Sequence, residues 1–313
     1  MSGGADVDRY DVVVIGAGPA GLSAGLNLVR SRRRVLMLDS NRPRHSATLI
    51  SHGFITRDGV SPIELRKLGR EEFEAYPDAE FHQGLVGSIA RVAGGDHFVV
   101  TARGVRGSAD REVTAPIVVL ATGLAETLPA LPSIRAYYGT SLHSCIECDA
   151  FEKAGEPLAL IGETADLAER AVLISQITDD LIVFTNGSAD AVSQAEETAL
   201  AGRGIRVERR PVADVVGDRS GLTGVSLDDG TVIARTGGFV RPLWSVPLGF
   251  ADSLGLDLDA EGHVVVDARG ATSVPGVYAA GDLTPPGSQQ LIVAAGAGAR
   301  VAAAVNRDLL GPL

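Results

Sequence analysis

Short, continuous apolar runs recur along the chain, and glycine turns and helix-forming segments separate them. Residues 10–15 are apolar and β-branched, and a glycine turn and a helical segment follow them. Similar runs occur at 34–39, 117–123 and 181–185, and residues 156–177 repeat the order of strand, turn and helix. Such runs, bounded by turn signals, are typical of buried strands in a parallel sheet. The pattern therefore predicts an α/β protein.

The glycines after the first run have the spacing G-x-G-x-x-G. The first allows a tight turn, the second lets the backbone approach a pyrophosphate, and the third lets the helix pack closely on the strand. The next strand ends in an acid about 18 residues past the third glycine, where this fingerprint places a ligand for a ribose hydroxyl. The predicted dinucleotide site comprises Gly16, Gly18, Pro19, Ala20, Gly21 and Asp39.

Two later strands also end in glycine-containing turns. Residues 117–123 end in Thr122-Gly123, and residues 274–283 contain Gly281-Asp282. A segment rich in small residues follows and predicts a helix that begins near Gln290 and Leu291. With these motifs in this order, the chain resembles flavoproteins that have two dinucleotide-binding domains. The resemblance implies FAD as the cofactor, bound also by Thr122 and Gly123, with Asp282 at the ribityl chain and with Gln290 and Leu291 near the isoalloxazine ring.

Both cysteines of the chain lie in HSCIECDAFE, residues 143–152. A lone Cys-x-x-Cys is typical of a redox pair, in which one thiolate attacks a disulfide and the other resolves the mixed disulfide. Only thiolates react, so an adjacent acid can relay the proton; Asp149 is the candidate and His143 is a weaker one. The six histidines do not cluster here at ligand spacing, so we expect no metal.

With Cys145-x-x-Cys148-Asp149 included, the chain resembles the low-molecular-weight thioredoxin reductases over nearly its whole length. The resemblance implies two Rossmann-like dinucleotide-binding domains, the second inserted into the first. It assigns residues 1–120 and 245–313 to a discontinuous FAD-binding domain. It assigns residues 121–244 to an inserted NAD(P)-type domain that carries the cysteines. Proteins of this family are usually homodimers, and their cysteine pair reacts with the flavin.

The second nucleotide turn departs from the NADPH-using pattern. Thr164 stands where the second glycine should be, and Glu163 and Asp166 place negative charge where phosphates would bind. No arginine pair follows the next strand; Arg209 and Arg210 come after a later strand and are expected at the surface. Each absent arginine–phosphate contact removes a charge-assisted hydrogen bond worth about 1.5–3 kcal/mol. The sequence therefore argues against tight NADPH binding.

Residues 46–77 also differ from the thioredoxin reductases. The HGFITRDG segment of this chain resembles the corresponding segment of flavin dithiol oxidases, such as those that form gliotoxin and holomycin. In these oxidases O₂ reoxidises the flavin. His52 is a possible flavin or substrate contact in this loop, and Asp58-Gly59 favours a helix cap and turn. The oxidases usually carry a histidine after the second cysteine, whereas this chain has Asp149. The chain thus combines features of both groups.

The overall composition limits the classes of partner. The net charge of −11 argues against nucleic-acid and anionic-membrane partners. No N-terminal segment has the apolar core of a signal peptide, and no apolar run is long enough to span a membrane. Two cysteines are too few for a secreted disulfide scaffold. We therefore expect a cytoplasmic protein.

Three hypotheses for the function follow. The first is an FAD-dependent dithiol/disulfide oxidoreductase that does not use NADPH, either an O₂-dependent dithiol oxidase or an enzyme with another electron partner. The second is an NADPH-dependent thioredoxin-disulfide reductase, and the third is a non-enzymatic flavoprotein redox sensor. The expected partner is a thioredoxin-like protein or a small-molecule dithiol or disulfide, and we expect a homodimer. The intact cysteine motif argues against the third hypothesis, and the altered second turn argues against the second.

Overall fold

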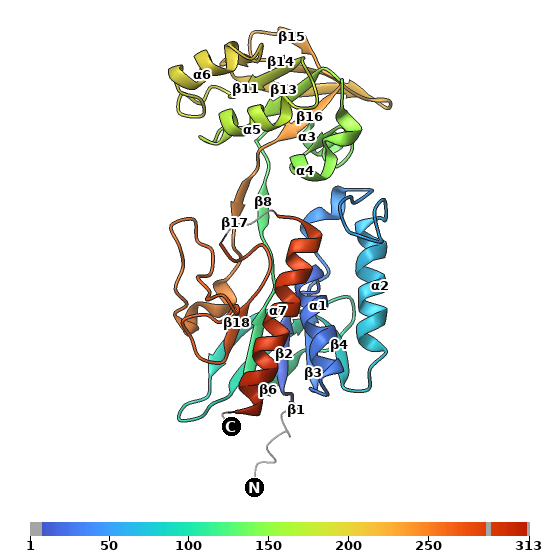
Figure 1. The fold of residues 1–313 in the computed structure, drawn as a ribbon, viewed down its shortest axis with the longest axis vertical. Helices are drawn as coiled ribbons and strands as arrows, with labels where there is room; N and C mark the ends of the chain where they lie inside the picture. The colour runs from blue at the N-terminus through green and yellow to red at the C-terminus, as the bar shows by residue number, and fades with distance from the viewer. Residues whose placement is uncertain (1–7, 286–288, 312–313) are drawn as a thin grey trace. The chain divides into compact units, whose positions relative to one another are not determined.

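The computed structural model describes residues 8–285 and 289–311, and the chain forms two compact units (Figure 1). The first unit comprises Met1–Ser46, Gly53–Ala125 and Ser245–Leu313, and the second comprises Ala47–His52 and Glu126–Trp244. The predicted inserted domain begins at residue 121, and residues 47–52 are predicted to belong to the first domain. In the structure, 47–52 belongs to the second unit.

The first unit is built on an eight-stranded sheet in the order β1-β6-β5-β4-β3-β2-β7-β18. The strands are β1 (Asp8–Arg9), β2 (Val12–Ile15), β3 (Val35–Asp39), β4 (Ala79–Arg91), β5 (Phe98–Gly104), β6 (Arg111–Ala115), β7 (Ile117–Leu120) and β18 (Val277–Ala279). The strands β4, β3, β2, β7 and β18 pair in parallel, while β4, β5 and β6 pair antiparallel. All residues of β2 and β7 are buried, as their continuous apolar sequences predict.

Three helices accompany this sheet: α1 (Pro19–Arg30), α2 (Pro62–Glu74) and α7 (Leu291–Leu310). Figure 1 shows α7 beside α1. The approach is close because α7 is rich in small residues: a Cβ atom on Gly298 would lie 2.0 Å from the carbonyl oxygen of Ala20. The shorter η1 (Arg44–Ala47) and η3 (Gly249–Leu254) are 3₁₀ helices. Within the described ranges, no helix has the length and apolar character to cross a membrane.

The second unit has a five-stranded parallel sheet in the order β12-β11-β10-β16-β9. Its strands are β9 (Leu142–His143), β10 (Leu158–Ile161), β11 (Leu181–Phe184), β12 (Arg206–Glu208) and β16 (Gly237–Val240). Its helices are α3 (Ile134–Tyr137), α4 (Ile146–Asp149), η2 (Phe151–Lys153), α5 (Leu167–Ile174) and α6 (Gln194–Ala201). A three-stranded antiparallel sheet adds β13 (Val212–Asp218), β14 (Gly221–Leu227) and β15 (Val232–Ala234). The predicted α/β architecture with two Rossmann-like sheets is confirmed.

Two short strands, β8 (Ala125–Thr127) and β17 (Leu243–Ser245), form a separate two-stranded sheet. Each of them contains a boundary between the two units. The proline-rich segment 241–249, which the sequence analysis takes as a linker, includes β17. The other proline-rich segment, 128–133, begins directly after β8. The chain therefore passes between the units through strand-forming residues as well as through prolines.

Candidate active site and cofactor site

The first glycine turn lies between β2 and α1, at the carboxyl end of a strand with a parallel neighbour on each side. Gly16 has φ +103°, and a Cβ atom there would lie 2.3 Å from the carbonyl oxygen of Ala121. A Cβ atom on Gly21 would lie 1.8 Å from the carbonyl oxygen of Gly16. Both positions therefore need glycine for the turn itself, whatever the turn binds.

Gly18 is different, because a Cβ atom there would have no atom of the described residues within 4 Å. It has φ −77° and is the N-cap of α1, with no side chain capping the helix, and Pro19 occupies the first turn. Uncapped N–H groups at a helix N-terminus are a ready site for an anion. The described contacts do not require a glycine here, and a glycine would allow a phosphate to approach the backbone closely.

Asp39 ends β3 and is hydrogen-bonded to the glycine turn between β2 and α1. Its Oδ2 accepts a hydrogen bond from the Ala17 backbone N–H at 2.7 Å, and its Oδ1 accepts one from Arg66 Nη2 at 3.0 Å. Arg66 comes from α2 and also donates to the carbonyl oxygen of Ala17 at 3.1 Å and to Asn41 Oδ1 at 3.1 Å. Sequence reasoning missed Arg66, since no local motif marks an arginine in a helix after a long loop.

The remaining predicted FAD residues lie at the ends of β7 and β18 and at the start of α7. Thr122 follows β7, and its Oγ1 is buried without a hydrogen-bond partner among the described residues. Asp282 follows β18, and its Oδ2 lies 2.6 Å from Arg44 Nη2. Gln290 is the N-cap of α7 and Leu291 is its first residue.

Gly123 and Gly281 both adopt positive φ, +66° and +87°. Since β2, β3, β7 and β18 are parallel neighbours, their carboxyl ends share one edge of the sheet. An uncapped helix N-terminus, open space over Gly18 and an orphaned hydroxyl fit a dinucleotide.

Cys145 and Cys148 form a disulfide with a Cα–Cα distance of 5.3 Å. Cys145 is the N-cap of the four-residue helix α4, and Cys148 and Asp149 are its last two residues. Glu147 Oε2 lies 3.9 Å from Cys145 Sγ. A carboxylate beside a sulfur disfavours the negatively charged thiolate, so Glu147 would oppose ionisation of Cys145 once the disulfide is reduced.

Asp149 lies against His143, which the sequence analysis ranks as the weaker proton-relay candidate. His143 Nδ1 and Asp149 Oδ1 are 3.0 Å apart, and the two side chains are only 10% and 13% exposed. The His143 ring lies 6.4 Å from the ring of Phe239 on the neighbouring strand β16. The fold therefore places the two candidate proton-relay residues, His143 and Asp149, next to each other.

His52 is the last residue of the segment Ala47–His52, which belongs to the second unit. Its Nε2 is 3.4 Å from Glu152 Oε1 in η2. Asp58 accepts a hydrogen bond from the Gly53 N–H at 2.8 Å and so forms a turn, as predicted. The cap of α2 is nevertheless Ser61, whose Oγ accepts from the Glu64 N–H. The expectation that Asp58 caps the helix is therefore wrong.

In the second nucleotide turn, the acidic side chain that the sequence contains is paired with other side chains of the chain. Asp166 is the N-cap residue of α5, and its Oδ2 lies 2.9 Å from Arg170 Nε and 2.7 Å from Arg241 Nε. Burial alone would raise the pKa of Asp166, but hydrogen bonds from Thr164, Arg170 and Arg241 outweigh it and lower the pKa to about 2. Arg241 in turn stacks on the Trp244 ring at 4.0 Å.

This arrangement changes the interpretation of the turn. From the sequence, Asp166 is expected to be an uncompensated negative charge, whereas in the structure two arginines neutralise it. The Asp166 carboxylate is therefore compensated, although it makes no capping hydrogen bond to the N-terminus of α5. Glu163 is exposed and accepts a hydrogen bond from Asn186 Nδ2 at 2.6 Å.

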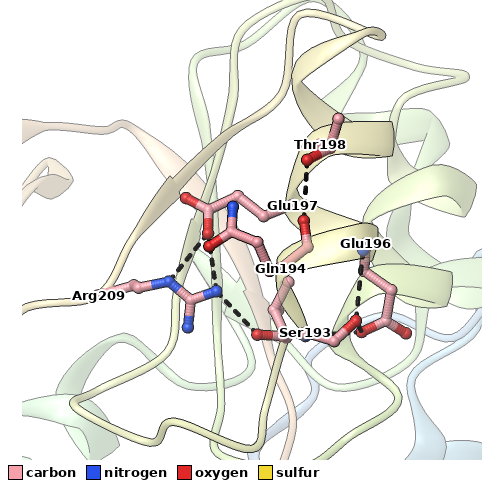
Figure 2. A network of polar contacts seen from close by, with 7 residues as sticks. Ser193, Gln194, Glu196, Glu197, Thr198 and Arg209 are labelled. Atoms are coloured by element: carbon pink, nitrogen blue, oxygen red, sulfur yellow. Dashed lines mark hydrogen bonds and ion pairs between the residues drawn. The ribbon is translucent and has the colours of Figure 1, made fainter.

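Arg209 and Arg210 follow β12 and are engaged elsewhere. Arg209 Nε and Nη2 donate to Glu197 Oε2 on α6 at 3.0 and 2.7 Å, beside the Ser193–Glu196 capping box (Figure 2). Arg210 pairs with Glu208 and Asp229. Their side chains are 38% and 45% exposed, so the expectation of a surface position holds.

Comparisons with known proteins show which family and which solved structures this chain is similar to. A family model for pyridine nucleotide-disulphide oxidoreductases matches residues 10–299. Thioredoxin reductase sirT of Leptosphaeria maculans is 28% identical over 316 residues, which cover 96% of this chain and 95% of that protein. The crystal structure of TrxB from Bacillus anthracis has 36% identity and a TM-score of 0.88, and the match covers 96% of this chain and 98% of that one. The structure of HlmI has 35% identity and a TM-score of 0.88, with 99% and 94% covered.

Proposed function

Because the chain belongs to the pyridine nucleotide-disulphide oxidoreductase family, we propose that it is an FAD-dependent dithiol oxidase that works without a nicotinamide cofactor. The fold is that of the low-molecular-weight thioredoxin reductases, and the protein is a flavoenzyme of that type, as the sequence predicted. Under the proposal, electrons run from a small-molecule dithiol to the Cys145–Cys148 disulfide, and then through FAD to O₂.

The observation that carries the proposal is the Asp166 carboxylate in the second nucleotide turn, which already pairs with the two arginines beside it. Asp166 stands at the N-terminus of α5 and is held by Arg170 and Arg241. A pyrophosphate at this helix end would meet a carboxylate already bonded to both guanidinium groups. Thr164 adds a side chain where the dinucleotide pattern requires glycine. This supports an enzyme that does not draw electrons from NADPH.

The first turn, in contrast, keeps the features that FAD would use. The N–H groups at the start of α1 would hold its pyrophosphate over Gly18, and Asp39 would accept from a ribose hydroxyl. Asp282 would bind the ribityl chain, and Thr122 Oγ1 would gain the partner that it lacks. Bound FAD supplies two-electron chemistry that connects a dithiol to O₂.

The chain's own part of the reaction is thiol–disulfide exchange at Cys145 and Cys148. A substrate thiolate attacks one sulfur, the S–S bond breaks, and the leaving sulfur departs as a thiolate that takes up a proton. The second substrate thiolate attacks the mixed disulfide, which closes the substrate disulfide and frees the other enzyme sulfur. Two electrons and two protons have then passed from substrate to enzyme, and Asp149 carries a proton between them.

A second candidate is an NADPH-dependent reductase of a thioredoxin-like protein. The relatives favour it, since sirT and a protein of Aquifex aeolicus that is 28% identical are both called thioredoxin reductase. Asp149 after the second cysteine also matches the resemblance to that group. In this case electrons would run in the opposite direction, from NADPH towards the cysteines. The expected homodimer is compatible with either function and stays a prediction.

The test is oxygen uptake by the purified holoprotein with a small dithiol and no nicotinamide. We expect O₂ consumption with stoichiometric peroxide, and we expect loss of both in Cys148→Ser, with free FAD at the same concentration as the blank. Oxygen uptake that proceeds equally in Cys148→Ser would contradict the role of the cysteines. Disulfide reduction that requires NADPH would establish the second candidate instead.

A further inference from the structure

Arg44 and Asp282 form an ion pair between two segments of the first unit that are far apart in the sequence. Arg44 Nη2 lies 2.6 Å from Asp282 Oδ2, and the two residues are 238 positions apart. Arg44 begins η1, and Asp282 follows β18. Their side chains are only 20% and 19% exposed. A short charged pair that is largely shielded from water holds its geometry better than a pair on the open surface.

The turn around Asp282 fixes its backbone but not its carboxylate. Gly281 has φ +87°, and its carbonyl oxygen accepts hydrogen bonds from the Thr284 N–H at 3.0 Å and from Thr284 Oγ1 at 2.8 Å. Leu283, which follows Asp282, is fully buried. The backbone therefore has a fixed course, and the direction of the carboxylate depends on rotation about the side-chain bonds. Among the hydrogen bonds of the described residues, the one from Arg44 sets that direction.

The other acid that we assign to the FAD site is held in the same way. Asp39 Oδ1 lies 3.0 Å from Arg66 Nη2, and the two side chains are 12% and 15% exposed. Both arginines, Arg44 and Arg66, come from the part of the chain between β3 and β4. A partly buried carboxylate needs a charged partner, because it has lost most of its contact with water. One connection of the chain therefore supplies an arginine to each acid.

We propose that Arg44 is a positioning residue of the FAD site, which directs the Asp282 carboxylate towards the ribityl chain. The inference deepens the proposed function and rests on its assignment of FAD as the cofactor. A carboxylate offers about four lone-pair sites, and Arg44 contacts Oδ2, so acceptor capacity remains for a ribityl hydroxyl. Without Arg44, the carboxylate turns towards water, because no other described side chain forms an ion pair with it.

The proposal links Arg44 to one half of the cofactor. Gly18 and Asp39 are assigned to the pyrophosphate and to the adenosine ribose, and Asp282 is assigned to the ribityl chain. ADP contains the adenosine and two phosphates but no ribityl chain. Loss of Arg44 therefore weakens FAD binding and spares ADP binding. An arginine that bound the pyrophosphate itself, or that only supported the fold of the site, would affect both ligands alike.

The test is a double-mutant cycle on FAD binding to the apoprotein, measured by flavin fluorescence. We expect Arg44→Met and Asp282→Asn each to lower FAD affinity about 10-fold, and the double variant to bind no more weakly than the weaker single variant. Arg42→Met is the matched control, because Arg42 is an exposed arginine close to Arg44 in the sequence and its loss changes the net charge equally. This control should bind FAD as the wild type does.

Calorimetric titration with ADP separates a positioning role from a structural one. We expect Arg44→Met to keep its ADP affinity within about 2-fold of the wild-type value. Arg66→Ala is the positive control, because Arg66 holds Asp39, and this variant should bind both FAD and ADP more weakly. Should Arg44→Met fail to fold, Arg44→Gln replaces it in both titrations, since glutamine keeps a donor and removes the charge.

The inference would be overturned by wild-type FAD affinity in Arg44→Met, by multiplicative losses in the double variant, or by an ADP loss as large as the FAD loss. These results concern Arg44 alone and leave the proposed function standing. If the wild-type apoprotein bound no FAD, the cofactor assignment of the proposed function would fail, and the inference would fail with it. The two kinds of failure are therefore distinguishable.

Discussion

Arg66 Nη2 lies 3.0 Å from Asp39 Oδ1, and through this contact helix α2 holds the acid that ends β3. The same guanidinium donates to the carbonyl oxygen of Ala17 inside the glycine turn. The Arg66 and Asp39 side chains are 15% and 12% exposed. Arg66 therefore fixes both the acid and the turn that the proposed FAD site needs.

Replacing Arg66 should weaken the flavin site. In Arg66→Ala, Asp39 loses its charged partner, and we expect FAD affinity to fall about 10-fold or more, since a hydrogen bond to a charged group is worth about 1.5–3 kcal/mol. Titration of the apoprotein with FAD, followed by flavin fluorescence, measures this. The control is Lys67→Ala on the same helix, because Lys67 is 60% exposed and pairs with the exposed Glu64 and Glu71 of that helix. Equal affinities in the two variants would contradict the role of Arg66.

Two glycines of the first turn should respond differently to alanine. Gly18→Ala adds a methyl group that meets no atom of residues 8–285 or 289–311 within 4 Å, so the fold should be unchanged while FAD affinity falls. Gly21→Ala places its methyl group 1.8 Å from a backbone oxygen, and we expect the melting temperature of the apoprotein to fall by about 5 °C or more. Melting curves and FAD titrations of both variants measure the contrast. A Gly18→Ala protein with wild-type FAD affinity would show that no phosphate lies over this residue.

Asp166 should contribute to stability in a pH-dependent way. Its pKa of about 2 in the folded chain lies below its ordinary value of 3.8, so its stabilisation is present above about pH 4 and is lost as the pH falls towards 2. Solvent screening of this half-buried group reduces the effect to about 1 kcal/mol. Asp166→Asn should be less stable than wild type at pH 7, and the difference should shrink at acid pH in urea titrations. A difference that is constant with pH would rule out the ionised carboxylate as its cause.

The fold could be predicted from the sequence because its signals are local. The runs that become β2, β7 and β10 are continuous and apolar, and each is fully buried. Gly16 and Gly21 of the first turn are required by close contacts with the turn itself and with Ala121 after β7, so their spacing alone is informative. Likewise, a lone Cys-x-x-Cys motif marks a redox pair without any tertiary information.

The missed features are contacts between distant parts of the chain. Arg66 is 27 residues from Asp39 and Arg241 is 75 residues from Asp166, and no periodicity or motif joins either pair. For this reason the sequence does not reveal that the negative charge of Asp166 is compensated. Its partner Arg241 follows β16, and only the folded sheet brings the two side chains together. Ser61 outcompetes Asp58 as the cap of α2 because it directly precedes Pro62, a favoured first residue of a helix.

The central claim is that electrons enter from a dithiol and not from a nicotinamide. Anaerobic stopped-flow absorbance of the holoprotein, mixed separately with NADPH, NADH and dithiothreitol, tests it most directly. The account predicts that only dithiothreitol bleaches the visible flavin band, that Cys148→Ser abolishes this bleaching, and that air restores the colour. Rapid bleaching by NADPH at micromolar concentration would contradict the account and identify a reductase.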